Sequence, residues 1–102
     1  MIICTPEYAF GVPGALKNAL DWTVSSAEFN EKPVVAISAS PLTTGGDKAL
    51  ASLLLTLKAL GTKMSEDSSL SIPTINHKLT AGELTDEKTI SELKKLVDVL
   101  IR

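Results

Sequence analysis

The sequence has few of the residues on which disulfide-bonded and metal-binding proteins depend, and it has no long apolar segment of the kind found in membrane proteins. Its 102 residues include a single cysteine, Cys4, and a single histidine, His77. One cysteine cannot form an internal disulfide, which fits a reducing, cytoplasmic setting, and His77 has no His, Cys or acid cluster around it to make a metal site. No apolar run approaches the roughly 18 residues of a membrane span, and no basic leader precedes an apolar stretch. We therefore expect no metal, no membrane segment and no signal peptide.

Charge is also low and evenly spread. Ten Lys and Arg residues against twelve Asp and Glu give a formal net charge of −2, which provides no basic footprint for nucleic acid or an anionic lipid surface. An apolar share of 44% is typical of a folded domain. We expect residues 1–102 to form a single domain.

Short apolar runs alternate with amphipathic stretches along the chain. In chain order, the patterns predict a strand at 1–4, a helix at about 13–25, a strand at 34–39, a leucine-striped helix ending at Gly61, a weak strand at 62–65 and a helix opening at 85–87. A further extended piece is expected at 70–72, and Thr44 with Asp47 resembles a capping box for the second helix. Strands that alternate with helices predict a parallel α/β sheet with right-handed crossovers.

Two polar loops, 5–12 and 40–46, each follow a predicted strand. The carboxyl ends of parallel strands meet at one rim of a sheet, where open α/β folds bind their ligands. The two loops are therefore the candidate binding region.

The first of these loops opens a long and specific motif. It runs from Thr5-Pro6-Glu7-Tyr8 to the string Pro13–Trp22, and a second block runs from Lys32 to Pro41 with Gly45 and Gly46 after it. Together they resemble the NAD(P)H-dependent FMN reductase family of flavodoxin-like proteins, which includes related quinone, chromate and azo reductases. The resemblance covers residues 1 to about 61 well and 82–102 loosely.

The resemblance implies a three-layer α/β/α fold with strand order 2-1-3-4-5 and FMN at the switch point between strands 1 and 3. The three strands here would correspond to 3-4-5. The chemistry implied is hydride transfer from NAD(P)H to FMN and on to a flavin, quinone or azo acceptor; because the cofactor carries it, no catalytic side chain is expected. The cofactor-binding residues implied are Pro6, Glu7, Tyr8, Ala9, Ser40, Gly45 and Gly46.

Two positions depart from the family pattern. Ala9 stands where the family has Asn, and Leu42-Thr43 stand where it usually has glycines. A purely structural role remains an alternative for both loops. The first would then be an ordinary strand-to-helix loop, and residues 40–46 would be a helix-capping turn.

By this resemblance Met1 stands at the third strand of the fold, so we expect the C-terminal portion of such a domain, without the first two βα units and the FMN phosphate loop. The alternative to an FMN reductase is a non-catalytic fragment that folds by self-association and does not bind FMN tightly. A response-regulator-like signalling domain shares the topology, but nothing in the sequence supports it. Residues 2–4 would form an unpaired apolar edge, which predicts a homodimer, with Cys4 a small buried hydrophobe.

Overall fold

A three-stranded parallel sheet forms the centre of the chain. The structure, a computed structural model, describes residues 1–101. The sheet has the order β1 (Ile2–Thr5), β2 (Val35–Ala39), β3 (Ser69–Ile72), and all its pairings are parallel. The predicted α/β class and strand order are confirmed.

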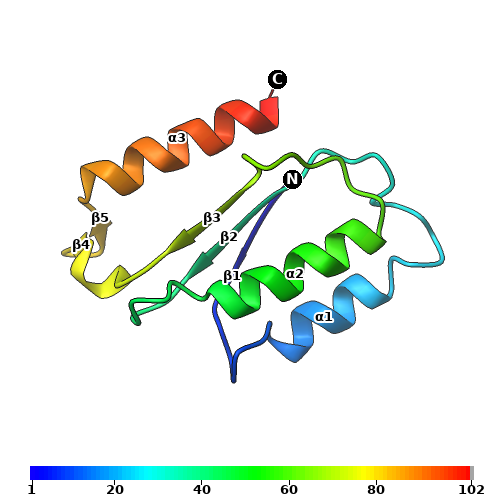
Figure 1. The fold of residues 1–102 in the computed structure, drawn as a ribbon, viewed down its shortest axis with the longest axis horizontal. Helices are drawn as coiled ribbons and strands as arrows, with labels where there is room; N and C mark the ends of the chain where they lie inside the picture. Colours follow the sequence, from blue (N-terminus) through cyan, green and yellow to red (C-terminus); the bar gives the residue numbers. More distant parts are fainter. Residues whose placement is uncertain (102) are drawn as a thin grey trace.

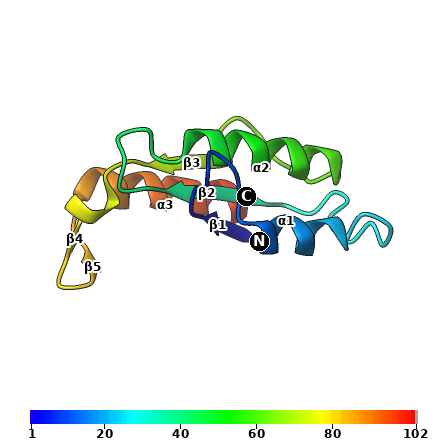
Figure 2. The same cartoon turned by 90° about the horizontal axis from the view of Figure 1, so that it is seen from below.

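Helices cover both faces of this sheet. Helices α1 (Gly14–Asp21) and α2 (Asp47–Ala59) lie on one face and α3 (Glu87–Ile101) lies on the other (Figure 1). Figure 2 looks from below onto α1 and α2, with the strands and α3 behind them. A 3-10 turn, η1 (Ile75–His77), and a small antiparallel hairpin of β4 (Leu79–Thr80) and β5 (Glu83–Leu84) connect β3 to α3.

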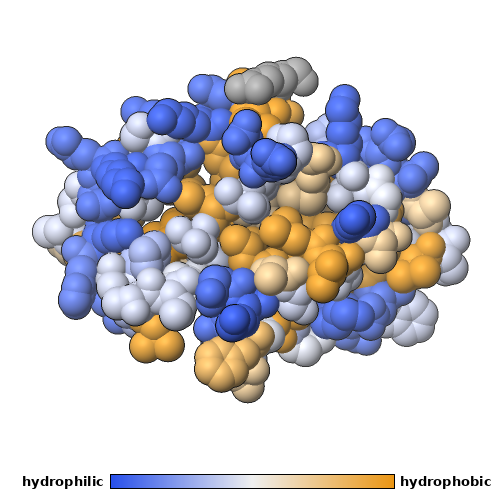
Figure 3. All heavy atoms as spheres, in the orientation of Figure 1, coloured by the Kyte–Doolittle hydropathy of each residue, from blue (hydrophilic) through white to orange (hydrophobic). Residues whose placement is uncertain are grey.

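The core follows from the apolar pattern of β2. Residues 34–38 are buried, because one face of the strand meets α2 and the other meets α3. The predicted leucine stripe packs as expected: Leu50, Leu53 and Leu57 are buried, while Leu55 points to solvent. Figure 3 shows hydrophobic surface in the middle of the face seen in Figure 1, between α3 and α2, with hydrophilic side chains around it.

Two predicted elements were wrong in extent or place. Helix α1 ends at Asp21 and not near residue 25, because the Thr23 hydroxyl bonds back to the Leu20 carbonyl at 2.7 Å and the β-branched and serine residues that follow favour turns. The third strand is 69–72, not 62–65, where Lys63 makes only an isolated bridge to Pro33. Leu70 and Ile72 supply the apolar side chains that pack under α3.

Cys4 is exposed, so its predicted burial was wrong. Its register partner in β2 is Ile37, which lies in the cluster under α3, so Cys4 and Ile2 point to the α3 side of the sheet. Helix α3 packs on β2 and β3, and the same side of β1 is left open. The position of one helix therefore decides the environment of Cys4.

The described part of the chain has no helix long and apolar enough to cross a membrane. Within residues 1–101, His, Cys, Asp and Glu side chains form no group of three that could hold a metal ion. His77 is exposed in η1.

Candidate functional site

The two predicted loops meet at the carboxyl ends of β1 and β2. The Glu7 carboxylate, in the first loop, accepts a hydrogen bond from the backbone N–H of Ala49, just beyond the second loop, at 3.1 Å. Gly46 lies against the same side chain, because a Cβ atom on Gly46 would stand 3.6 Å from the Glu7 Cβ. The predicted site residues are thus brought together at one rim of the sheet.

Glu7 acts as the cap of α2. The N-cap residue of this helix is Gly46, which has no side chain to satisfy the first N–H groups. The predicted capping box does not form, since Thr44 contributes only its carbonyl, which accepts from the Asp47 N–H at 3.2 Å. A carboxylate at a helix N-terminus satisfies an N–H group and interacts favourably with the helix dipole. The Glu7 side chain is therefore engaged within the protein, and its backbone is the part free to meet a ligand.

Tyr8 stands at the base of a tight turn. Its backbone N–H and C=O both pair with Gly11 at 2.9 Å, and the two residues between them, Ala9 and Phe10, have positive φ angles of 48° and 62°. Positive φ at both central positions is typical of a type I′ turn, which favours Asn and Gly. The turn leaves Tyr8 63% exposed, with its ring open to a ligand at the rim.

The second loop is held by buried residues. Ser40 is buried, and its hydroxyl accepts a hydrogen bond from the Leu42 N–H at 3.1 Å. Ser38, which the sequence analysis did not single out, donates its hydroxyl to the Gly45 carbonyl at 2.7 Å. The sequence did contain a signal for this role, because Ser38 is a polar residue inside an otherwise apolar predicted strand.

The two glycines of this loop are needed for close packing. A Cβ on Gly45 would lie 3.0 Å from the Pro73 nitrogen, and one on Gly46 would lie 3.1 Å from the Ser38 Cβ. Both glycines also have positive φ. The structural interpretation of the second loop therefore accounts for Ser40, Gly45 and Gly46, whose binding roles stay predictions. The exposed part of the loop is 41–44.

Both loops expose residues at the rim. The first loop offers Pro6, Tyr8 and Ala9, all exposed, and the second offers the exposed stretch 41–44. A flat heterocycle needs backbone groups and an aromatic or apolar wall on either side. The exposed aromatic ring of Tyr8 and the exposed backbone of 41–44 are groups of this kind, and the hydrogen bond of Glu7 to Ala49 joins the loops that carry them.

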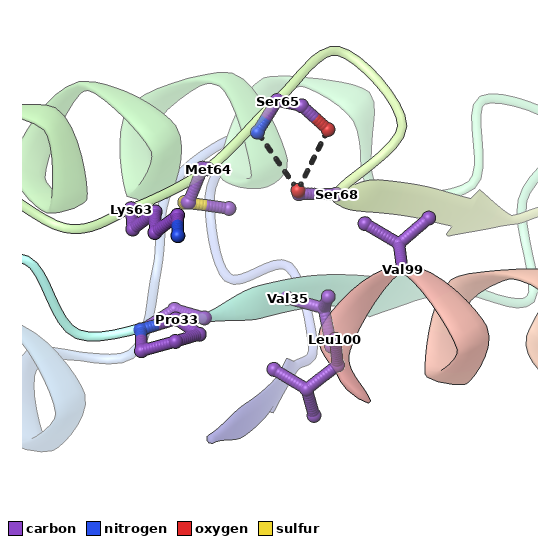
Figure 4. A pocket seen from close by; sticks show the side chains of 9 residues that line it. Pro33, Val35, Lys63, Met64, Ser65, Ser68, Val99 and Leu100 are labelled. Atoms are coloured by element: carbon purple, nitrogen blue, oxygen red, sulfur yellow. Dashed lines mark hydrogen bonds between the residues drawn. The ribbon is translucent and has the colours of Figure 1, made fainter. Parts of the chain in front are cut away.

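A separate cavity of 240 Å³ lies at the opposite end of the sheet (Figure 4). It is lined by the start of β2, the segment before β3 and the end of α3, where the Ser65 N–H donates to the Ser68 hydroxyl at 2.9 Å. Because parallel sheets bind ligands at the carboxyl ends of their strands, this cavity does not belong to the candidate site.

Among the residues that the structure describes, Asp86 is the titratable group whose pKa is shifted from its ordinary value. Like the cavity, Asp86 lies away from the rim, at the start of α3. Its carboxylate accepts hydrogen bonds from the hydroxyl of Thr89 at 2.6 Å and from the Thr89 N–H at 3.0 Å. These bonds lower the pKa of Asp86 below its ordinary value of 3.8. The group caps a helix and has no place in the candidate site.

Comparisons with known proteins agree with this geometry. The model of the NADPH-dependent FMN reductase family matches residues 1–77. The chain is 31% identical over 100 residues to the CrdA subunit of an NADH:(hydroxy)cinnamate reductase from Vibrio ruber, across 94% of this chain and 50% of that protein. It is also 31% identical over 97 residues to a quinone reductase of Escherichia coli K12, across 91% of this chain and 52% of that protein.

The fold is found in a solved structure too. FerB, a flavoenzyme NAD(P)H:(acceptor) oxidoreductase from Paracoccus denitrificans, superposes with a TM-score of 0.84 at 34% identity, covering 98% of this chain and 57% of FerB. The chain spans about half the length of the relatives it matches. The motif at the rim, the flavodoxin-like sheet and the match over residues 1–77 together show that the chain belongs to the NADPH-dependent FMN reductase family.

Proposed function

We propose that this chain forms the ring-binding side of an FMN site in an NAD(P)H-dependent reductase. The observation that carries the proposal is the hydrogen bond from the Ala49 N–H to the Glu7 carboxylate, which joins the two rim loops and leaves Tyr8 exposed beside them. When bound, FMN would accept a hydride from the nicotinamide and pass the electrons to an acceptor. Relatives named as quinone reductase and azoreductase suggest quinones or azo compounds as acceptors, along with free flavin.

The residues of this chain would hold and orient the flavin and would not take part in the chemistry themselves. Glu7 would fix the distance between the two loops, the Tyr8 ring would form one wall for the isoalloxazine, and 41–44 would form the other. By the family resemblance the phosphate of FMN is held by a loop after the first strand of the whole fold, which is not among strands β1 to β3. A single cysteine and the use of NAD(P)H both suit a cytoplasmic setting.

The test is a titration of the purified chain with FMN and with riboflavin, followed by quenching of flavin fluorescence. If this chain supplies the ring side, both ligands should bind, with dissociation constants within about threefold of each other, because the phosphate adds little. Tyr8→Ala should weaken both by about three- to tenfold, since aromatic stacking contributes about 0.5–1.5 kcal/mol.

Trp22→Ala is the matched control, because Trp22 is also an exposed aromatic but follows the far end of α1, away from the rim. It should leave both dissociation constants unchanged. A chain that quenches neither flavin at saturating concentration would overturn the proposal and favour the alternative, a non-catalytic fragment. The inward-facing Ser40, Gly45 and Gly46 are the observation that favours this second candidate.

A further inference from the structure

The outer edge of β3 is the free edge of the sheet on the side away from β1 (Figure 1). In the strand order 2-1-3-4-5 of the family, β3 corresponds to strand 5, which is the outermost strand. The remaining strands of the whole fold add beyond β1, so they leave the far side of β3 unpaired. The outer edge of β3 is therefore also an outer edge in the whole fold.

The backbone of β3 offers hydrogen-bonding groups along this edge. The Ala36 N–H of β2 donates to the Ser68 carbonyl at 2.9 Å, just before β3 begins. Because alternate residues of a strand face the same neighbour, Ser69 and Ser71 direct their N–H and C=O groups away from β2, toward the open side. The edge ends at Pro73, which has no N–H. Two residues therefore offer four backbone groups to an added strand.

A hollow of 540 Å³ borders the edge on the α2 side of the sheet. Ser69 lines it together with the apolar side chains of Leu54 and Met64. Its lining also includes Lys58 and Glu66, whose opposite charges cancel. Side chains of an added strand that point to this face would therefore meet an apolar surface without net charge.

A second hollow of 400 Å³ borders the same edge on the α3 side. Its charged lining consists of Glu66, Asp67, Glu92 and Lys95, which are three carboxylates against one ammonium group. Within residues 1–101, these carboxylates form no ion pair, so a ligand can still neutralise their charge. The α3 side of the edge therefore favours cationic side chains.

The two hollows match the geometry of a β-strand, whose successive side chains point to opposite faces. An extended segment that pairs with Ser69 and Ser71 would place alternate side chains in the apolar and the acidic hollow. In recognition of this kind, backbone hydrogen bonds give affinity and the pockets for alternate side chains give specificity. A second copy paired through β3 would instead bring two acidic hollows to one interface, and charges at an edge discourage such self-pairing.

We propose that the outer edge of β3 binds an extended segment of a different polypeptide, in which apolar side chains alternate with lysine or arginine. The apolar side chains pack against Leu54 and Met64 on the α2 side. The basic side chains pair with Glu66, Asp67 and Glu92 on the α3 side. This proposal does not depend on flavin binding.

The first test measures the charge preference by fluorescence anisotropy. The probes are a labelled seven-residue peptide in which valine alternates with lysine, and a matched peptide with glutamate in place of lysine. At low salt the lysine peptide should bind about tenfold more tightly, and the difference should shrink at high salt because the charges are then screened. Equal binding of the two peptides to the unchanged chain would overturn the proposal.

Asp67→Lys reverses one charge of the acidic hollow, so it should reduce the preference for the lysine peptide to less than about threefold. Glu83→Lys is the matched control, because it makes the same charge change at an exposed position of β5 that lines neither hollow. It should leave the preference unchanged. Equal effects of the two substitutions would show an influence of net charge alone and would overturn the proposal.

The second test concerns the backbone pairing. Ser71→Pro removes an N–H that points away from β2 and leaves the ladder to β2 intact, so the fold should survive. It should weaken binding of the lysine peptide at least tenfold, with an unchanged far-UV circular dichroism spectrum. Ser71→Thr keeps the N–H and is the matched control, which should bind the peptide as the unchanged chain does.

Amide hydrogen exchange locates the peptide without any substitution. The amides of Leu70 and Ile72 face β2 and should exchange slowly with or without the peptide, whereas those of Ser69 and Ser71 should exchange quickly until the lysine peptide protects them. Three results would each overturn the proposal: no binding at millimolar peptide, binding that leaves the Ser69 and Ser71 amides unprotected, or self-association of the chain that Ser71→Pro abolishes.

Discussion

The Glu7 carboxylate accepts a hydrogen bond from the Ala49 N–H, although the two residues are 42 positions apart in the chain. Glu7 lies in the loop after β1 and Ala49 in the first turn of α2. One contact thus caps a helix and fixes the distance between the two loops of the candidate site. The local stability of α2 and the geometry of the rim are therefore coupled.

Glu7→Ala should lower the free energy of unfolding by about 1 kcal/mol, because it removes the cap of α2 and its interaction with the helix dipole. Urea unfolding followed by circular dichroism measures this change. Glu28→Ala is the control: Glu28 is exposed in the turns after α1, and its loss should change stability by less than about 0.5 kcal/mol. Equal effects of the two substitutions would contradict the capping role.

Ala9→Asn should stabilise the chain by about 0.5 kcal/mol. Ala9 has a φ angle of 48°, and Asn adopts this left-handed conformation more readily than Ala. The same substitution at the exposed Ala19, inside α1, should destabilise by a similar amount, because Asn is a poorer helix former. Thermal unfolding of both variants tests the opposite signs; a loss of stability at both positions would count against the turn geometry.

Gly46→Ala should destabilise the chain by at least about 1 kcal/mol. The residue has a φ of 76°, and the added Cβ would stand 3.1 Å from the Ser38 Cβ and 3.3 Å from the Ser38 hydroxyl oxygen. Gly14→Ala is the contrasting control, since its Cβ would meet nothing within 4 Å and Ala favours the start of α1. It should be stabilising by about 0.5 kcal/mol. A gain at Gly46 as well would show that the loop can move away from Ser38.

The strands and helices that the sequence predicted well are those with a strong local pattern. The run 34–39 is apolar on both faces, and Leu50, Leu53 and Leu57 recur at helical spacing, so periodicity alone was enough. The third strand was misplaced because Ser69-Leu70-Ser71-Ile72 is short and alternates with serine. Only its pairing with β2 and the packing of α3 over Leu70 and Ile72 distinguish it from a loop.

The position of the candidate site followed from topology, because both loops come after strands of a parallel sheet. The roles of the individual residues in the site could not be predicted from the topology. The pairing of Glu7 with Ala49 and of Ser38 with Gly45 depends on how separate segments pack, and the burial of Ser40 depends on the end of β3, whose Ile72 carbonyl accepts from the Ser40 N–H at 3.1 Å. These contacts cannot be predicted from the spacing of residues in the sequence. The exposure of Cys4 was missed for the same reason.

Asp86 should contribute to stability in a pH-dependent way. Hydrogen bonds from the hydroxyl and the N–H of Thr89 favour the ionised carboxylate, which lowers the pKa of Asp86 below 3.8 in the folded chain. A group whose pKa is lowered by folding stabilises the fold above its unfolded pKa, and this contribution disappears as the pH falls through the folded value. The contribution should therefore be complete near neutral pH and be lost progressively as the pH falls below about 5 and through the folded-state pKa.

The measurement is the melting temperature across that range, together with the Asp86 pKa from carboxyl carbon chemical shifts. Thr89→Val removes the hydroxyl donor, so the pKa of Asp86 should rise toward 3.8, while Thr89→Ser keeps the donor and should leave the pKa low. Asp86→Asn still caps α3 but cannot titrate, so its melting temperature should depend less steeply on pH below about pH 5. An unchanged pKa in Thr89→Val would show that the Thr89 hydroxyl bond does not control the ionisation of Asp86.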